Sequence, residues 1–184
     1  MNELLEMLKI DSVYGVIIQL IGFVGLVMAV IAYQMKTQKK IVTVQIIGCS
    51  FFALHFFLLN AYTGAILNLI AAIRSVVFSN KDKKWAKSMW WVVFFSAASI
   101  VAVGFAWEGW LSLLPMAGMV LTTISWRIDK ASLVRLISLP SSPLWIIYNA
   151  VNKSSAGVLT EIFVMTSIIS AMIRLDLRSK NADK

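Results

Sequence analysis

The feature that most constrains this chain is a series of seven long apolar segments separated by gaps of only a few residues. The segments are predicted at residues 13–33, 41–59, 64–79, 88–106, 110–126, 132–150 and 156–174. Several approach the roughly 20 residues that a helix needs to cross a bilayer. Strands of a membrane barrel would instead alternate over about 10 residues each. We therefore predict an all-α membrane protein with seven transmembrane helices.

Composition and charge placement agree with a membrane protein. The chain is 59% hydrophobic and 14% charged, whereas soluble domains average about 45–50% and 25%. The net charge of +8 comes from Lys and Arg residues in the short gaps. A nucleic-acid binder would gather them on one soluble face. The predicted partner is therefore the lipid bilayer, and no nucleic acid is expected. The first twelve residues lack the basic start of a cleavable signal peptide.

The basic residues also predict an orientation. If the seven spans alternate, fifteen of the seventeen fall on or near one side. They are Lys36, Lys39, Lys40, Arg74, Lys81, Lys83, Lys84, Lys87, Arg127, Lys130, Arg135, Arg174, Arg178, Lys180 and Lys184, against Lys9 and Lys153 opposite. Cytoplasmic loops are enriched in such residues. We predict a bacterial inner membrane protein with its N-terminus outside and its C-terminus in the cytoplasm. Arg74 and Arg135, a turn or two inside their spans, are expected to snorkel to the headgroups.

An internal repeat is predicted from a shift of 93 residues. The shift aligns Gly25 with Gly118, Ala32-Tyr33-Gln34 with Ser125-Trp126-Arg127, Leu54-His55 with Ile147-Tyr148, Gly64 with Gly157, and Asn68 with Glu161. The order of long and short gaps also repeats. Weak repeats of this kind are common in transporters.

This repeat predicts a 3+1+3 organisation. Residues 13–79 would form one three-helix bundle, 88–106 a linker transmembrane helix and 110–174 a second bundle, with short tails at 1–12 and 175–184. A single linker span returns the second bundle to the orientation of the first. The two bundles would then be parallel and related by a pseudo-twofold axis along the membrane normal, as in SWEET sugar transporters.

Three segments carry a resemblance to a known group of membrane proteins. They are Ala32-Tyr33-Gln34-Met35-Lys36-Thr37-Gln38-Lys39, Tyr62-Thr63-Gly64-Ala65-Ile66-Leu67-Asn68, and Ser141-Ser142-Pro143-Leu144-Trp145-Ile146-Ile147-Tyr148-Asn149. With the 3+1+3 plan, the chain resembles the SWEET, PQ-loop and MtN3-like superfamily, and most closely the YgjV-type bacterial inner membrane proteins. The resemblance covers nearly the whole chain and implies a carrier.

The chain departs from the superfamily at its Pro-Gln pair. The pair reads Tyr33-Gln34 in the first half and Trp126-Arg127 in the second, so the proline is absent from both. The resemblance implies that such prolines act as hinges during alternating access. Any hinge here must lie elsewhere, and the segment from Pro140 to Pro143 is the candidate.

Glu161 is the candidate site residue with the clearest physical argument. It lies in an apolar segment, about 8 Å from the predicted helix start at the usual rise. Ionisable residues inside a membrane are costly and usually face a bundle interior or a wet cavity. The alternative is that Glu161 meets water near the outer interface. The resemblance implies that its repeat partner, Asn68, lines a substrate pocket and faces Glu161 across it.

His55 and its repeat partner Tyr148 are two further candidates. His55 is the only histidine. A histidine titrates near neutral pH and suits proton coupling, but a polar residue satisfied by a bond across helices is an equally good interpretation. A lone histidine without nearby Cys or Asp does not favour a metal site.

Trp145 and Asn149 form a stripe with Tyr148, because positions three and four apart share a helix face. An aromatic side chain beside an amide suits a sugar or nucleoside. The six other tryptophans lie near span ends and are expected to form interfacial belts: Trp85, Trp90, Trp91, Trp107, Trp110 and Trp126.

The sequence leaves three hypotheses of function open. No nucleophile–base pair, phosphate loop or paired carboxylates can be placed on one face, so neither an enzyme nor a cofactor is expected. The first hypothesis is an alternating-access transporter of a small polar solute, with a pocket lined by Asn68, Glu161, His55, Tyr148, Trp145 and Asn149. A receptor on the same fold is the second. A vitamin or nucleoside carrier resembling the nicotinamide-riboside family is the third, and heavy aromatic lining would favour it. Homo-oligomers are left open.

Overall fold

The computed structural model describes residues 13–107, 109–151 and 155–177, and within them the chain is almost entirely helical. The elements are α2 (Val13–Tyr33), α3 (Gln38–Leu58), α4 (Tyr62–Ser79), α5 (Trp90–Phe105), the 3-10 turn η1 (Trp110–Ser112), α6 (Leu113–Arg127), α7 (Ala131–Ser138), α8 (Ser141–Val151), α9 (Ser155–Ala171) and the π-helical turn η2 (Met172–Leu177). They follow the seven predicted segments in order, so the all-α class is confirmed.

Membrane-spanning length is found for five of the seven predicted segments. Among the described residues, the helices long and apolar enough are Val13–Tyr33, Gln38–Leu58, Tyr62–Ser79, Ala131–Val151 and Gly157–Asp176. The apolar helix α5 has 16 residues, which is about 24 Å at the usual rise. The hydrocarbon core is about 30 Å thick. With 15 residues, α6 is also short.

The predicted span 132–150 is divided into two helices. It breaks where Leu139 and Pro140 separate α7 from α8. Pro140 has no backbone N–H and cannot continue the hydrogen bonds of α7. Pro143 lies in the first turn of α8, where backbone N–H groups have no partner within the helix in any case.

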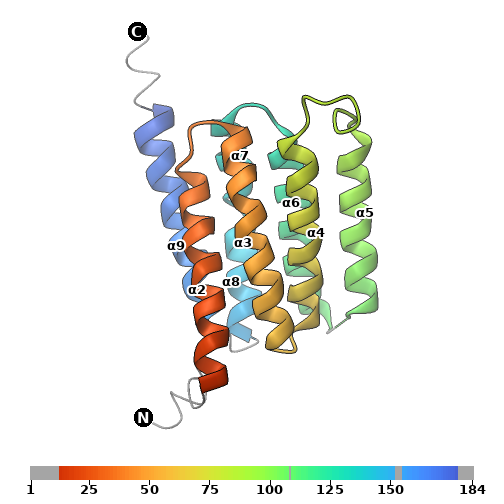
Figure 1. Ribbon diagram of the computed structural model, residues 1–184, viewed down its shortest axis with the longest axis vertical. Helices are drawn as coiled ribbons and strands as arrows, with labels where there is room; N and C mark the ends of the chain where they lie inside the picture. Colours follow the sequence, from red (N-terminus) through yellow and green to blue (C-terminus); the bar gives the residue numbers. More distant parts are fainter. Residues whose placement is uncertain (1–12, 108, 152–154, 178–184) are drawn as a thin grey trace.

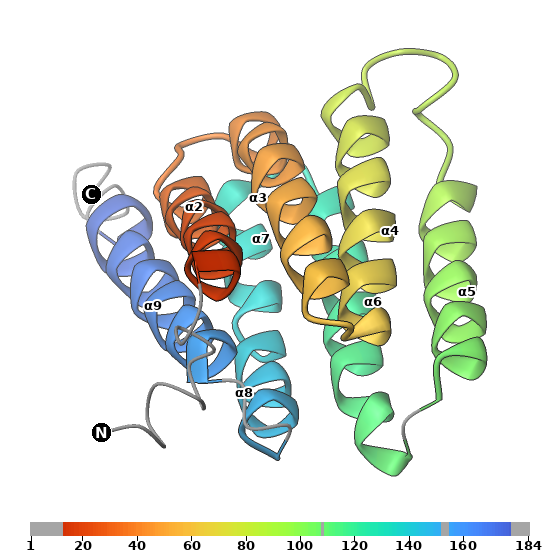
Figure 2. The ribbon, with the colours of Figure 1, turned by 60° about the horizontal axis from the view of Figure 1, so that its bottom comes forward.

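Six helices form a ring: α2, α3, α4, α6, α8 and α9. Each of the neighbours α2–α3, α3–α4, α4–α6, α6–α8, α8–α9 and α9–α2 is in contact. Figure 2 shows α9, α2, α3 and α4 side by side with α8, α7 and α6 behind them. Helix α5 packs against α4 and α6 at the edge of this ring. The ring therefore encloses an interior to which α5 does not contribute.

The outer surface is apolar along the length of the bundle. Leu20, Phe23 and Phe105 are 59%, 61% and 89% exposed. Soluble monomers rarely expose apolar patches beyond a few hundred Å². This surface instead suits the hydrocarbon interior of a bilayer.

The described basic residues of the connections gather at one end of the bundle. The connections after α2, α4 and α6 and the end of η2 all lie there, opposite the start of α2 (Figure 1). These connections and the helix ends beside them carry Lys36, Lys39, Lys40, Lys81, Lys83, Lys84, Lys87, Arg127, Lys130 and Arg174. We call this the basic end. Lys9, Lys153, Arg178, Lys180 and Lys184 lie outside the described residues, as do the tail 1–12 and most of the tail 175–184.

Candidate functional site

A hollow of about 110 Å³ lies inside the ring. A single buried water needs about 10–15 Å³, so the hollow has room for several waters. The hollow is lined by Ala29 and Tyr33 of α2, Gln45, Cys49, Phe52 and Phe56 of α3, Asn68, Ala71 and Arg74 of α4, Met119, Thr122 and Trp126 of α6, Ser141, Ser142, Trp145 and Asn149 of α8, and Gly157, Thr160, Glu161 and Val164 of α9.

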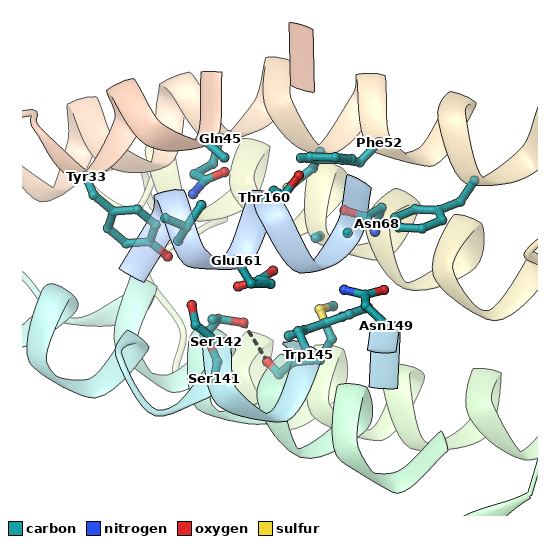
Figure 3. Close-up of a pocket in the computed structure, with 18 of the residues that line it drawn as sticks. Tyr33, Gln45, Phe52, Asn68, Ser141, Ser142, Trp145, Asn149, Thr160 and Glu161 are labelled. Atoms are coloured by element: carbon teal, nitrogen blue, oxygen red, sulfur yellow. Dashed lines mark hydrogen bonds between the residues drawn. The ribbon is translucent and has the colours of Figure 1, made fainter. Parts of the chain in front are cut away.

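Glu161 projects from α9 into this hollow, toward α8 (Figure 3). The buried Ser142 hydroxyl lies beside its carboxylate and has no other hydrogen-bond partner among the described residues. None of the salt bridges of the described chain includes Glu161. A carboxylate accepts hydrogen bonds through two oxygens. Glu161 and Ser142 therefore offer polar atoms to whatever fills the hollow.

Arg74 lies in the same wall and is 1% exposed, so the expectation that it snorkels is wrong. Its Nη1 donates to the carbonyl of Met119 at 3.1 Å and to the hydroxyl of Thr122 at 3.3 Å. It also donates to the hydroxyl of Thr123. The guanidinium stacks 4.2 Å from the centre of the Trp126 ring. These neutral partners on α6 hold Arg74 inside the bundle.

Five aromatic residues contribute to the wall: Tyr33, Phe52, Phe56, Trp126 and Trp145. Trp126 is 3% exposed, so its predicted place in the interfacial belt is wrong. Its stacking against the buried Arg74 accounts for the burial. By contrast, Trp85, Trp90, Trp107 and Trp110 are exposed as a belt requires.

The hollow brings together four of the six predicted site residues: Asn68, Glu161, Trp145 and Asn149. Asn68 donates from Nδ2 to the Gly64 carbonyl at 2.9 Å. Asn149 is 3% exposed. His55 and Tyr148 do not line the hollow. Tyr148 packs edge-on against Trp145, with ring centres 6.0 Å apart, and so stands behind the wall.

His55 is directed toward α2 and away from the hollow. Its Nδ1 lies 2.9 Å from the Ile18 carbonyl. A carbonyl only accepts, so Nδ1 carries the hydrogen. The ring also packs so closely on Gly22 that an added Cβ would lie 2.7 Å from Nδ1. Its expected place in the pocket is therefore wrong, and of the two open interpretations the geometry fits a polar residue satisfied across helices.

Arg135 is the centre of a hydrogen-bond network at the basic end. It is 2% exposed, so it does not snorkel as expected. From α7 it donates to the carbonyls of Tyr33 at 3.3 Å and Met35 at 3.0 Å. It also forms a two-point ion pair with Asp176, at 2.9 and 2.5 Å. The connection after α2 is thereby tied to α7 and η2.

Further links join other helices at this end. Gln38 at the start of α3 donates to the carbonyl of Trp126 at 2.5 Å. Gln34 donates to the Ser167 hydroxyl at 2.8 Å and accepts from Arg174. Ser167 in turn donates to the carbonyl of Val30 at 2.7 Å. The basic end is therefore held together by side chains that reach across the ring.

Sequence reasoning missed several residues of the wall, among them Arg74, Trp126, Tyr33, Gln45 and Ser142. A signal was present for four of them. The 93-residue shift pairs Tyr33 with Trp126, and Ser142 with Cys49, and both pairs line the hollow. Arg74 is a cation inside a predicted span, which indicates a functional residue. Because it lies close to the end of the span, however, snorkelling was the favoured interpretation.

Comparison with known proteins identifies the family. The model of the Imp-YgjV family, described as bacterial inner membrane protein, matches residues 16–179. The chain therefore belongs to this family, and the predicted YgjV-type resemblance is confirmed. No curated protein and no solved structure was found to match. Within the described residues, no group of three or more His, Cys, Asp or Glu is placed to hold a metal ion.

Proposed function

We propose that this bacterial inner membrane protein carries a small polar solute across the membrane by alternating access. Two three-helix units would move against each other, residues 13–79 and 110–174, with α5 as the linker. The observation that carries the proposal is the hollow between these units, lined by Asn68, Glu161 and Asn149. Ionisable residues at membrane depth are costly and mark solute pathways.

The contacts around four glycines support a parallel repeat. An added Cβ would lie 3.1 Å from the Phe52 ring at Gly25 and 2.9 Å from the Trp145 ring at Gly118; it would lie 2.9 Å from the Phe56 ring at Gly64 and 2.5 Å from the Asn149 amide at Gly157. Each glycine and each partner in the first half has its counterpart 93 residues later. Equivalent close packing at equivalent positions is what two copies of one unit would produce.

The wall of the hollow repeats in the same way. The same shift relates seven pairs of lining residues: Ala29–Thr122, Tyr33–Trp126, Cys49–Ser142, Phe52–Trp145, Phe56–Asn149, Asn68–Glu161 and Ala71–Val164. Helix bounds follow it too, since α3 (Gln38–Leu58) maps onto Ala131–Val151. A site at the interface of two repeats is typical of secondary transporters.

The network at the basic end supplies a gate for the proposed mechanism. Gln38 of the first unit holds the carbonyl of Trp126 in the second, and Arg135 of the second unit holds the carbonyl of Tyr33 in the first. Tyr33 and Trp126 are themselves repeat partners. Opening this end would require both links to break. The interruption at Pro140 would let α7 move without the whole of α8.

The basic end is proposed to face the cytoplasm, because positive residues concentrate in cytoplasmic loops. The five aromatic residues of the wall favour a second candidate, a carrier of a ring-bearing vitamin or nucleoside. The size of the hollow, about 110 Å³, favours the smaller solute. Pockets for drug-sized ligands hold about 300–1,000 Å³.

Uptake into proteoliposomes tests the proposal. Purified protein is reconstituted, and a panel of small labelled solutes is assayed by counterflow with wild type, Glu161→Gln and Thr166→Val. Thr166 is the matched control, because it lies on the same helix with an exposed side chain bonded only to the Ile162 carbonyl. Loss of a charged hydrogen bond costs about 1.5–3 kcal/mol, so Glu161→Gln should lower uptake about tenfold to a hundredfold. Absence of counterflow for every solute in wild type would refute the carrier.

A further inference from the structure

Two opposite charges stand in the wall of the hollow without neutralising each other. Arg74 comes from α4 and Glu161 from α9. The salt bridges of the described chain join Lys39 to Asp82, Lys81 to Asp129, and Arg135 to Asp176. Neither Arg74 nor Glu161 takes part in them. Arg74 is buried, and an uncompensated buried charge is strongly destabilising. Glu161 is partly exposed and faces the hollow. The described chain gives neither group an opposite charge in a salt bridge.

The Arg74 side is suited to an acidic group. Its hydrogen bonds to the described residues all leave from Nη1, and all go to neutral oxygens. Its Nε is buried and unpaired. A guanidinium has five N–H donors in a planar fork that matches a carboxylate at two points. The edge formed by Nε and Nη2 is therefore free for a carboxylate.

A second donor lies on the ring that stacks against Arg74. The indole N–H of Trp126, whose ring stacks on Arg74, is buried and makes no hydrogen bond to the described residues. It lies near the Tyr33 hydroxyl. An acceptor on the solute would pair the Arg74 Nε and share the Trp126 N–H with the Tyr33 hydroxyl, because buried polar groups are nearly always hydrogen-bonded.

The Glu161 side is suited to a cationic donor. The carboxylate accepts and does not donate, and Ser142 beside it has no partner among the described residues other than this carboxylate. The aromatic rings of Phe52, Phe56 and Trp145 border the same hollow. Ring faces attract ammonium groups. A primary ammonium would satisfy the carboxylate and still have a hydrogen for the Ser142 hydroxyl.

We infer that the solute is a small zwitterion of the amino-acid type, with its carboxylate at Arg74 and its ammonium at Glu161. This inference rests on the proposed function and names its substrate class. A zwitterion would neutralise both wall charges. A sugar would neutralise neither, and a simple anion or cation only one. The hollow, about 110 Å³, limits the solute to a small member of the class.

The test compares small amino acids with analogues that lack one of the two charges. Thermal stability of the purified protein is measured with alanine, lactate, ethylamine and alaninamide, and with serine, glycerate, ethanolamine and serinamide. A ligand that binds the folded form raises Tm by mass action. We expect Tm to rise with alanine or serine and not with the three analogues in the same set. A rise for lactate or glycerate equal to that for the amino acid, or no rise in either set, would overturn it.

Variants test which wall residue binds the carboxylate of the solute and which binds its ammonium group. Arg74→Gln should remove binding of the zwitterion, while Glu161→Gln should weaken it and remove the preference over the hydroxy acid. Should Arg74→Gln not fold, Trp126→Phe keeps the stacked ring, removes only the N–H and should weaken binding. Thr166→Val is the control and should bind as wild type does. Full binding by Arg74→Gln or Trp126→Phe would overturn the inference.

The outcomes separate this inference from the carrier proposal. A zwitterion that binds and depends on Arg74, but shows no counterflow, would uphold the substrate class and refute the carrier. Counterflow of a neutral solute that is insensitive to Arg74→Gln would uphold the carrier and refute the substrate class.

Discussion

The guanidinium of Arg135, on α7, donates a hydrogen bond of 3.3 Å to the carbonyl of Tyr33, the last residue of α2. Carbonyls in the last turn of a helix have no partner within the helix, and Arg135 supplies one from across the ring. Asp176 fixes the guanidinium through two oxygens. The ion pair therefore positions Arg135, and Arg135 holds the basic end together.

Breaking this ion pair should loosen the basic end. In Asp176→Asn the buried Arg135 loses its counter-charge, so Tm should fall, and Cys49 should react faster with a thiol reagent supplied from that end. Cys49 is the only cysteine of the chain and lines the hollow, so no engineered label is needed.

Asp82→Asn is the matched control for Asp176→Asn. The side chains of Lys39 and Asp82 are 64% and 72% exposed, and exposed pairs contribute about 0–1 kcal/mol. Equal Tm and equal labelling rates in the two variants would contradict a role for Arg135 at the basic end.

The glycines of the two halves should respond alike to substitution. In Gly64→Ala and Gly157→Ala the new methyl group would lie 2.9 Å from Phe56 and 2.5 Å from Asn149. Overpacking costs about 1–3 kcal/mol, so both should lower Tm in detergent. Gly104→Ala meets nothing within 4 Å and should be neutral or slightly stabilising, because alanine favours helix by about 0.8–1.0 kcal/mol. A Tm loss in Gly104→Ala as large as the other two would argue against packing as the cause.

His55 should contribute to stability through its hydrogen bond to the Ile18 carbonyl and should play no part in proton coupling. In His55→Asn an amide N–H can replace Nδ1–H toward the Ile18 carbonyl, so uptake and its pH profile should stay close to wild type. In His55→Leu the hydrogen bond is lost, which lowers stability by about 0.5–1.5 kcal/mol. If His55→Asn folds well but its uptake no longer varies with pH, the result would contradict this prediction and support a role for His55 in proton coupling.

Much of the fold could be predicted from the sequence, because the length of an apolar segment decides directly whether it can form a membrane-spanning helix. The bounds of α2 agree with the predicted segment 13–33. The interruption at Pro140 was less predictable, since two prolines in one span allow either a kink or a break. The order of helices around the ring depends on packing between distant segments, and no local pattern contains it.

The site was only partly accessible. Glu161 was found because a carboxylate stands out in an apolar helix, and Asn68 was found as its repeat partner. Arg74 and Trp126 were misplaced because each lies within a few residues of a span end, where the pattern alone favours an interface. Their mutual stacking, at 4.2 Å, joins α4 to α6 and cannot be inferred from either helix alone. His55 was misdirected because the sequence does not say which face of α3 it occupies.

The most direct test of alternating access is the sidedness of Cys49 labelling in oriented vesicles. A membrane-impermeant thiol reagent is added to either side, with and without a solute that shows counterflow. The carrier account predicts that Cys49 reacts from both sides, that Asp176→Asn increases reaction from the basic end, and that solute protects it. Reaction from one side only, unchanged by Asp176→Asn, would contradict alternating access and favour a receptor.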